Sequence, residues 1–363
     1  MKSIRVALKQ NPYTILIGAS ILSDIGKYLS NLKLGDTAII VTDPVIERLH
    51  AKSLTSGLKK NGFKVKIFTV PAGEKSKSVQ TAFDLLKRIA VYDVFKKSFI
   101  VAFGGGVIGD LAGFVASVYK RGVPYVQVPT TLLAQIDSAI GGKVAVDLPV
   151  GKNLVGAFYQ PKLVLSDVSV LSTLPKRQIR NGLAEAVKYG VIEDRKLFFY
   201  IAENYTKFIG ADLNALSNLV YGCSLIKTRI VEKDEKETKG IRTILNFGHT
   251  IGHAIETAGG YHLYHHGEAI ALGMRVAAEI SRKLGMFKKE DAESLNKLLT
   301  NIGLPEYIEK VALPKILSVM RHDKKFLAGR NRFVLAQQIG KVKVIEGIPL
   351  EVIKTALQKL SVT

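Results

Sequence analysis

The chain has 363 residues, 47% of them hydrophobic, which is enough for one large or two medium domains with sizeable cores. Its 52 basic and 31 acidic residues give a net charge of +21, but the basic residues are spread along the chain without interleaved aromatic residues, so we expect anionic substrates and no nucleic-acid partner. The single cysteine, Cys223, excludes an intrachain disulfide and a cysteine-rich zinc site, and neither a membrane helix nor a signal peptide is predicted, so we expect a cytoplasmic protein with no membrane partner.

The first half of the chain alternates apolar, β-branched runs with amphipathic segments. The runs predict strands at residues 37–42, 64–70, 98–103, 125–129 and 163–167. Helices are expected between them at residues 46–61 and 78–91. Strands that alternate with helices form a mostly parallel sheet with helices on both faces. We therefore expect a Rossmann-like, nucleotide-binding α/β domain over residues 1–170.

Beyond residue 174, long helical patterns replace the strand-like runs. Helices are expected at residues 177–191, 197–208, 213–235, 249–258, 266–284, 290–302 and 350–360. A short hairpin at 333–345 is the one interruption. The sequence therefore predicts a second, all-α domain over residues 171–363, and the histidine-rich segment described below makes it the candidate for binding metal and substrate. A small-molecule site is expected in a cleft that the two domains share.

A glycine-rich loop at residues 104–110 follows a predicted strand and opens a predicted helix. It satisfies G-x-G-x-x-G in the context that lets backbone approach a pyrophosphate. The acidic residue usual about 20 positions later is absent, although Asp43 could bind ribose hydroxyls instead. A purely structural glycine turn explains the loop equally well. Neither Lys143 nor Lys152, each of which follows a glycine, precedes the Ser or Thr of a Walker A loop, which disfavours an ATPase.

Lys143, Lys152 and Asn153 lie in a segment that mixes glycines, small residues and isolated charges. We expect a loop there, because glycine-rich backbone is mobile and lets side chains converge. Ammonium groups on such a loop suit phosphate or carboxylate. A solvated loop with ordinary lysines is the alternative.

Five of the seven histidines fall between residues 249 and 266, and imidazole is the commonest metal ligand. His249 and His253 lie four apart on one face of a predicted helix, in a spacing that resembles H-E-x-x-H. Thr250 stands where a metalloprotease carries its glutamate base, so that activity is disfavoured. A catalytic zinc needs three protein ligands and an open position. The candidates are these two histidines, His265, His266 and a carboxylate.

Glu185 is the best candidate for that carboxylate. It lies among small apolar residues near the start of a predicted helix, where an unpaired carboxylate is costly to bury. It could bind the metal, or it could form a salt bridge with Lys188, three positions on. Spacing alone leaves both interpretations open.

Six segments, in their order and spacing, resemble the 3-dehydroquinate synthase family over roughly residues 40 to 330. They read GGGVIGDLAGFVAS, PTTLLAQIDSAIGGK, GKNLVGAFYQP, LAEAVKYG, NFGHTIGHAIE and HGEAIALGM. The resemblance implies a phosphorus–oxygen lyase of the shikimate pathway, which converts 3-deoxy-D-arabino-heptulosonate 7-phosphate to 3-dehydroquinate and phosphate. It also implies catalytic use of NAD and a divalent metal, usually zinc, with cobalt as an alternative.

The resemblance also implies roles for single residues. The metal ligands would be Glu185, His249 and His266. The NAD site would be lined by Asp43, Glu74, Lys77, Gly104, Gly105, Gly106, Asp110, Thr130, Thr131, Asp137, Lys143, Lys152, Thr173 and Leu174. Substrate contacts would come from Lys143, Asn153, Lys188, Lys227, Arg242, Asn246, His253 and either Lys324 or Lys325. Arg121 matches an arginine that reaches the neighbouring subunit's phosphate site, so a homodimer is implied.

Two departures from the family pattern are visible. The segment 233–240 is about one residue longer than the family pattern, which bears on the alignment of Lys227. Asp43 is followed by Pro44 and Val45, so a polar adenosine contact is missing. The alternatives are another sugar-phosphate cyclase, acting on sedoheptulose 7-phosphate or glucose 6-phosphate, and a metal-dependent glycerol-type dehydrogenase. Arg242 and Asn246 suit a substrate carboxylate, which favours dehydroquinate synthesis.

Overall fold

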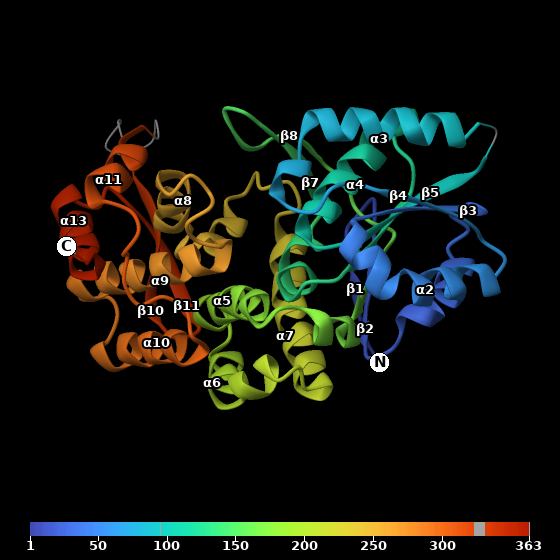
Figure 1. The fold of residues 1–363 in the computed structure, drawn as a ribbon. Coiled ribbons are helices and arrows are strands. Elements are labelled where there is room, and N and C mark those ends of the chain that lie inside the picture. The colour runs from blue at the N-terminus through green and yellow to red at the C-terminus, as the bar shows by residue number, and fades with distance from the viewer. Residues whose placement is uncertain (95, 323–330, 363) are drawn as a thin grey trace. The chain divides into compact units, whose positions relative to one another are not determined.

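A seven-stranded sheet organises the N-terminal part of this computed structural model, which describes residues 1–94, 96–322 and 331–362 (Figure 1). The strand order is β1-β2-β9-β6-β5-β3-β4, and every pairing is parallel except β1 with β2. The strands are β1 (Lys2–Val6), β2 (Tyr13–Gly18), β3 (Thr37–Thr42), β4 (Lys64–Thr69), β5 (Ser98–Gly104), β6 (Tyr125–Pro129) and β9 (Leu163–Asp167). All five expected strands are confirmed, and β1 and β2 extend the sheet at one edge.

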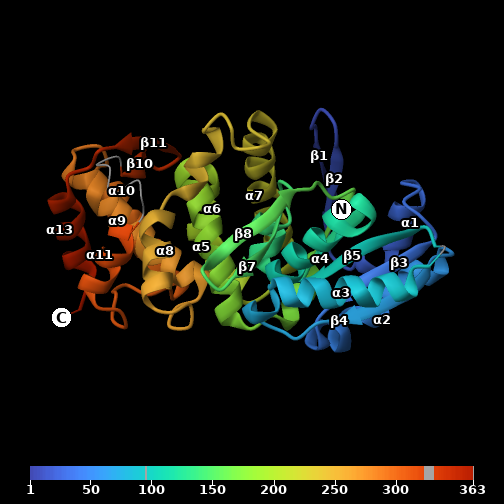
Figure 2. The same cartoon turned by 90° about the horizontal axis from the view of Figure 1, so that it is seen from above.

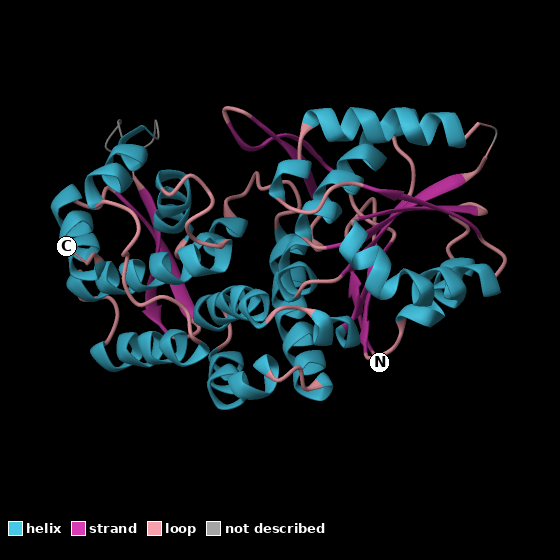
Figure 3. Ribbon diagram, in the orientation of Figure 1, coloured by secondary structure: helices cyan, strands magenta, loops and turns pink. Residues whose placement is uncertain are grey.

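Helices cover both faces of this sheet, as Figure 3 shows. Helices α3 (Val79–Tyr92) and α4 (Gly106–Val118) pack on one face, where the apolar core includes Leu85 and Leu111. Helices α1 (Ile25–Ser30) and α2 (Pro44–Lys60) pack on the other face, around Leu54 and Phe99. Strands β3 and β5 therefore lie between two apolar layers, which explains why their sequences are continuously apolar.

Side-chain caps fix where several helices begin. Asp43 precedes α2, and its Oδ1 accepts the backbone N–H groups of Val45 and Ile46, with Pro44 in the first helical position. Ser78 caps α3 by accepting the N–H of Thr81. These polar residues satisfy backbone donors that a helix start leaves without intrahelical partners.

The chain divides into two compact units that are interleaved in sequence. The first unit contains Met1–Pro175 and Ala211–Lys236, and the second contains Lys176–Gly210 and Glu237–Thr363. The sequence predicts two domains that are each continuous in sequence, with a boundary at residue 170. In the structure α7 (Leu213–Lys233) lies beyond that boundary but belongs to the unit that contains the sheet. The Lys2 ammonium donates to Asn218 Oδ1 at 2.5 Å, and the Ala7 N–H donates to Glu232 Oε1 at 2.6 Å.

The described residues of the second unit are helical apart from one hairpin, at the position where the sequence indicates one. Its helices are α5 (Lys176–Ile192), α6 (Arg195–Ile209), α8 (His249–Ala258), α9 (His266–Lys283), α10 (Lys289–Ile302), α11 (Leu313–His322) and α13 (Leu350–Leu360). The hairpin pairs β10 (Arg332–Gln338) with β11 (Lys341–Glu346). Helix α11 is an addition to the expected set. Within the described ranges, no helix combines the length and the apolar character that crossing a membrane requires.

Candidate functional site

Small residues let α8 and α9 of the second unit pack backbone against backbone. Gly248 precedes α8 in a left-handed conformation, with φ 81°, and its carbonyl oxygen lies 1.9 Å from where a Cβ on Gly273 would stand. A Cβ on Gly252 would lie 2.7 Å from Ile270 Cδ1. This close crossing brings the first residue of α8, His249, to the first residue of α9, His266.

We expect Gly273→Ala to destabilise the protein by about 1–3 kcal/mol, the usual cost of overpacking a filled core. Alanine is the better helix former, but its methyl group would collide with a backbone carbonyl that cannot rotate away. Urea unfolding measures the change. Gly210→Ala is the control, because the nearest atom there lies 3.3 Å from the new Cβ. Equal stability of the two variants would contradict this account of the crossing.

Three of the expected metal ligands converge within this unit. Glu185 Oε1 lies 3.3 Å from His249 Nε2 and 3.2 Å from His266 Nε2. One ligand atom from each residue lies within 4.8 Å of the others. The Glu185 side chain is fully buried on α5, whereas His266 is about one-third exposed, at 32%. One carboxylate and two imidazoles form the donor set of a catalytic zinc site with an open position.

Each of the three residues has a further partner. The Lys188 ammonium contacts Glu185 Oε2, so the expected salt bridge and the expected metal ligand are the same carboxylate. His249 Nδ1 lies 3.2 Å from the Phe247 carbonyl oxygen, and His266 Nδ1 lies 3.4 Å from Glu256 Oε2. These contacts orient both rings so that Nε2 points toward Glu185.

Electrostatics at the cluster favour a charged carboxylate. Burial alone would raise the pKa of Glu185, but Lys188, His249 and His266 hold that pKa well below its usual range. Burial likewise opposes protonation of His266, yet its hydrogen bonds to Glu185 and Glu256 raise its pKa to about 10. A metal ion must therefore displace a proton from His266 to bind there.

His253 and Glu256 border the same cluster. The His253 ring centroid lies 5.2 Å from that of His249, and Glu256 lies one helical turn further along α8. His253, Glu256 and His266 form a second group whose ligand atoms lie within 4.8 Å of one another. His265 belongs to neither group found among the described residues, and its backbone N–H donates to Glu268. Glu256 was not anticipated, although a carboxylate three residues after His253 was a usable signal.

The other expected substrate residues of this unit lie on or beside η6 (Ile241–Asn246). Arg242 is buried, and its Nε lies 3.3 Å from Glu237 Oε1. Asn246 ends the same short helix. Lys324 and Lys325 lie outside the described residues.

In the first unit the glycine loop has the expected strand–turn–helix form. Strand β5 ends at Gly104, and α4 begins at Gly106, within the glycine-rich loop itself. Cβ atoms would lie 3.0 Å from Thr131 at Gly105 and 3.1 Å from Ser138 at Gly106, so the loop packs closely. The Thr130 N–H donates to the Gly104 carbonyl at 2.9 Å.

The loop expected around Lys143, Lys152 and Asn153 is wrong. This segment forms a hairpin of β7 (Lys143–Leu148) and β8 (Gly151–Phe158), which contacts α4 and α3 (Figure 2). Its glycines indicated mobile backbone, but Gly156 instead allows close strand pairing. A Cβ there would lie 2.3 Å from the Val144 carbonyl oxygen.

Several residues expected in the NAD site form one network around Lys77. Its ammonium lies 2.5 Å from Asp110 Oδ2 on α4 and donates to Asn153 Oδ1, also at 2.5 Å. Lys152 forms a salt bridge with Glu74 at 3.0 Å. The network therefore joins the helix after the glycine loop to the hairpin.

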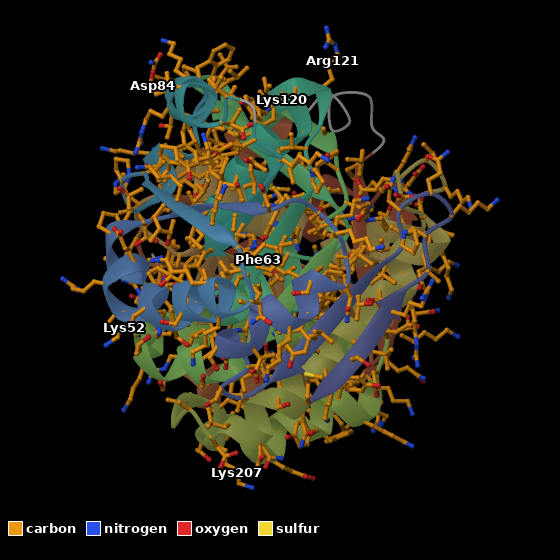
Figure 4. All side chains as sticks on the ribbon, turned by 90° about the vertical axis from the view of Figure 1, so that its right-hand side faces the viewer. Lys52, Phe63, Asp84, Lys120, Arg121 and Lys207 are labelled. Atoms are coloured by element: carbon orange, nitrogen blue, oxygen red, sulfur yellow. The ribbon has the colours of Figure 1, made fainter. Side chains whose placement is uncertain are left out.

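Other expected residues of this unit have partners of their own. Lys227 on α7 donates to Asp137 Oδ1 at 2.7 Å, on the π-helical turn η4 (Ala134–Ser138). Thr173 Oγ1 lies 2.9 Å from His50 Nε2 at the end of η5 (Val168–Thr173), which Leu174 follows. Arg121 is exposed and projects outward (Figure 4).

Comparison with known proteins decides the family. The N-terminal family model of 3-dehydroquinate synthase matches residues 67–181, and the C-terminal model matches residues 182–326. A curated 3-dehydroquinate synthase from Desulforamulus reducens is 45% identical over 96% of this chain and 97% of its own length. The chain belongs to the 3-dehydroquinate synthase family. One from Thermodesulfovibrio yellowstonii is 42% identical over 99% of this chain and 100% of its own.

Solved structures agree with membership of the 3-dehydroquinate synthase family. A 2-deoxy-scyllo-inosose synthase complexed with carbaglucose-6-phosphate, NAD+ and Co2+ is 28% identical, with a TM-score of 0.89 over 99% of this chain and 100% of that chain. The expected family and fold class are therefore confirmed. The expected cofactors agree with those in this cyclase and with the donor set of Glu185, His249 and His266.

Proposed function

We propose that this member of the 3-dehydroquinate synthase family converts 3-deoxy-D-arabino-heptulosonate 7-phosphate to 3-dehydroquinate and inorganic phosphate. The observation that carries the proposal is the convergence of Glu185, His249 and His266 in a chain related over nearly its whole length to curated 3-dehydroquinate synthases. The donor set fits a divalent ion, and zinc is the ion proposed, with cobalt as the alternative.

The metal would be held by Glu185 Oε1 and by Nε2 of His249 and His266. A divalent ion held by these atoms would polarise a substrate oxygen as a Lewis acid, and NAD would supply a reversible hydride acceptor. Glu256 and the Phe247 carbonyl hold the two rings in place. His253, beside the cluster and exposed, is placed to exchange a proton with substrate at Nε2.

The glycine loop of the first unit is the proposed pyrophosphate site. It ends at the N-terminus of α4, where backbone N–H groups and the helix dipole favour phosphate. The polar residues around it are proposed to bind the rest of NAD. They are Asp43, Glu74, Lys77, Asp110, Thr130, Thr131, Asp137, Lys143, Lys152, Thr173 and Leu174.

Cationic and amide side chains are proposed to bind the substrate's carboxylate, hydroxyls and phosphate. They are Lys143, Asn153, Lys188, Lys227, Arg242 and Asn246, with Arg121 reaching a partner subunit in a homodimer. Their ammonium and guanidinium groups would neutralise the charge of the substrate and orient it in the site.

Another sugar-phosphate cyclase activity is the second candidate, favoured by the likeness to 2-deoxy-scyllo-inosose synthase. Its substrate would carry no carboxylate. The proposed contact of Arg242 with a substrate carboxylate therefore favours the carboxylate-bearing heptulosonate. A cytoplasmic location is proposed with the pathway.

The decisive assay is phosphate release from 3-deoxy-D-arabino-heptulosonate 7-phosphate by protein supplied with trace NAD and zinc. We expect release that EDTA abolishes and zinc restores, with dehydroquinate as product and no accumulation of NADH, because hydride returns to the substrate. Sedoheptulose 7-phosphate serves as the comparison substrate. Release from it alone would support the second candidate, and stoichiometric NADH would indicate a dehydrogenase.

A further inference from the structure

The hairpin of β7 and β8 is irregular at Asp147. Val146 pairs with Val155 and Leu148 pairs with Gly151, so Asp147 stands alone opposite residues 152–154. A bulge of this kind takes residues out of the ladder and redirects their side chains. Here it releases Lys152 and Asn153, which the proposed function assigns to NAD and substrate.

Asp147 holds this bulge through its side chain. Its Oδ1 accepts the backbone N–H of Asn153 at 2.8 Å. Asn153 has φ 58°, in the left-handed region that residues other than glycine adopt at a cost. The carboxylate therefore satisfies the N–H group of the one residue of β7 and β8 that has a left-handed backbone.

The backbone of Asp147 holds a second element. Its N–H donates to the Lys77 carbonyl oxygen at 2.8 Å, and Asp147 forms a parallel bridge with Ser78. The Lys77 ammonium returns to Asn153 Oδ1 and also contacts Asp110. Asp147, Lys77 and Asn153 thus form a closed ring of hydrogen bonds, attached at Asp110 to the helix of the glycine loop.

We propose that Asp147 is a positioning residue that sets the geometry of Lys77, Lys152 and Asn153 without itself touching substrate or cofactor. The proposal rests on the proposed function. Without the Asp147 acceptor the bulge becomes mobile, so Lys152 and Asn153 lose their fixed positions. Their contacts are then weakened equally with the bound substrate and with the transition state. Such a uniform loss raises KM and leaves kcat nearly unchanged.

Three variants separate position from charge. We expect Asp147→Ala to raise KM for the heptulosonate phosphate about tenfold, the effect of about one lost hydrogen bond, with kcat within about twofold. Asp147→Asn keeps an oxygen acceptor and should stay close to the parent protein. Asp147→Glu keeps the charge but displaces the acceptor, and should resemble the alanine variant. Asp84→Ala is the control, because it removes one carboxylate from an exposed position on α3 (Figure 4).

The KM values of the three Asp147 variants, compared with one another, decide whether the proposal holds. If Asp147→Asn is impaired while Asp147→Glu matches the parent protein, charge rather than position matters and the proposal is overturned. A parent-like KM in Asp147→Ala overturns it too. If the alanine variant does not fold, the contrast between the asparagine and glutamate variants carries the same test.

Hydrogen exchange tests the ring without substrate. The Asn153 amide should exchange faster in Asp147→Ala than in the parent protein, and Asp147→Asn should restore its protection. Unchanged protection in the alanine variant would refute the positioning role. If the parent protein lacks synthase activity but these exchange rates differ, the proposed function fails while the ring of hydrogen bonds stands.

Discussion

Replacing His249 with alanine is expected to remove the bound metal and to lower turnover by about three orders of magnitude. The loss removes one of three ligands, and Lewis-acid stabilisation is worth several kcal/mol, at about 1.4 kcal/mol for each factor of ten. The fold should survive, because His249 is the first residue of α8 and is not among the buried residues with which that helix packs into its core. Metal content per chain and phosphate release are measured on the same samples.

His262→Ala is the matched control for this prediction. It makes the same change in the same histidine-rich segment, but His262 is exposed and contacts the Gly260 carbonyl at 3.0 Å, outside either ligand group. It should retain metal and turnover. Full turnover by a His249→Ala sample that holds no metal would contradict the assignment of Glu185, His249 and His266 as a catalytic metal site.

The second large effect concerns Lys188, whose ammonium is buried against Glu185. Lys188→Met keeps the length of the side chain but removes the charge, and leaves Glu185 as a buried carboxylate without its strongest counter-charge. Breaking a buried ion pair on one side costs about 3–5 kcal/mol. We expect a loss of that size in the metal-free protein and a smaller loss with zinc, because the ion supplies the missing positive charge.

Urea unfolding with zinc and with EDTA measures both values. Lys354→Met is the control, because Lys354 and Glu351 form an ion pair with the same three-residue spacing on the exposed face of α13. An exposed ion pair contributes only about 0–1 kcal/mol to the free energy of unfolding. The double variant Glu185→Gln with Lys188→Met should recover most of the loss in the metal-free protein. A loss that is identical with and without zinc would show that the ion does not reach Glu185.

Local patterns singled out candidates for the metal cluster, and only the resemblance to the family selected Glu185, His249 and His266 among them. His249 and His253 share a helical face by spacing, and Glu185 stood out as a charge among small apolar residues. Spacing could not decide between a metal ligand and a salt bridge for Glu185, because the same carboxylate makes contacts of both kinds. Glu256 lies three residues after His253, which placed it near the cluster, but its contact is with His266, a ring placed by another helix, and no local pattern encodes that contact.

Elements fixed by distant partners were harder to predict. The hairpin at Lys143–Phe158 is rich in glycines, which usually indicate loops, and only pairing with Val144 reveals why Gly156 is there. Strands β1 and β2 are short and gain their stability at the edge of a sheet built from much later residues. The grouping of α7 with that sheet depends on contacts such as Lys2 with Asn218, which no local pattern encodes.

The interleaving of the two units has a consequence for synthesis on the ribosome. The sheet is finished in sequence at Asp167, but the helix that packs against β1 and β2 ends only at Lys233. The nascent N-terminal unit must therefore wait for roughly 66 further residues before its last layer is available, several seconds at about 5–20 residues per second. During that interval the apolar surface that α7 covers is accessible to chaperones. A gene truncated after residue 175 would encode the sheet without α7, so this surface would stay exposed.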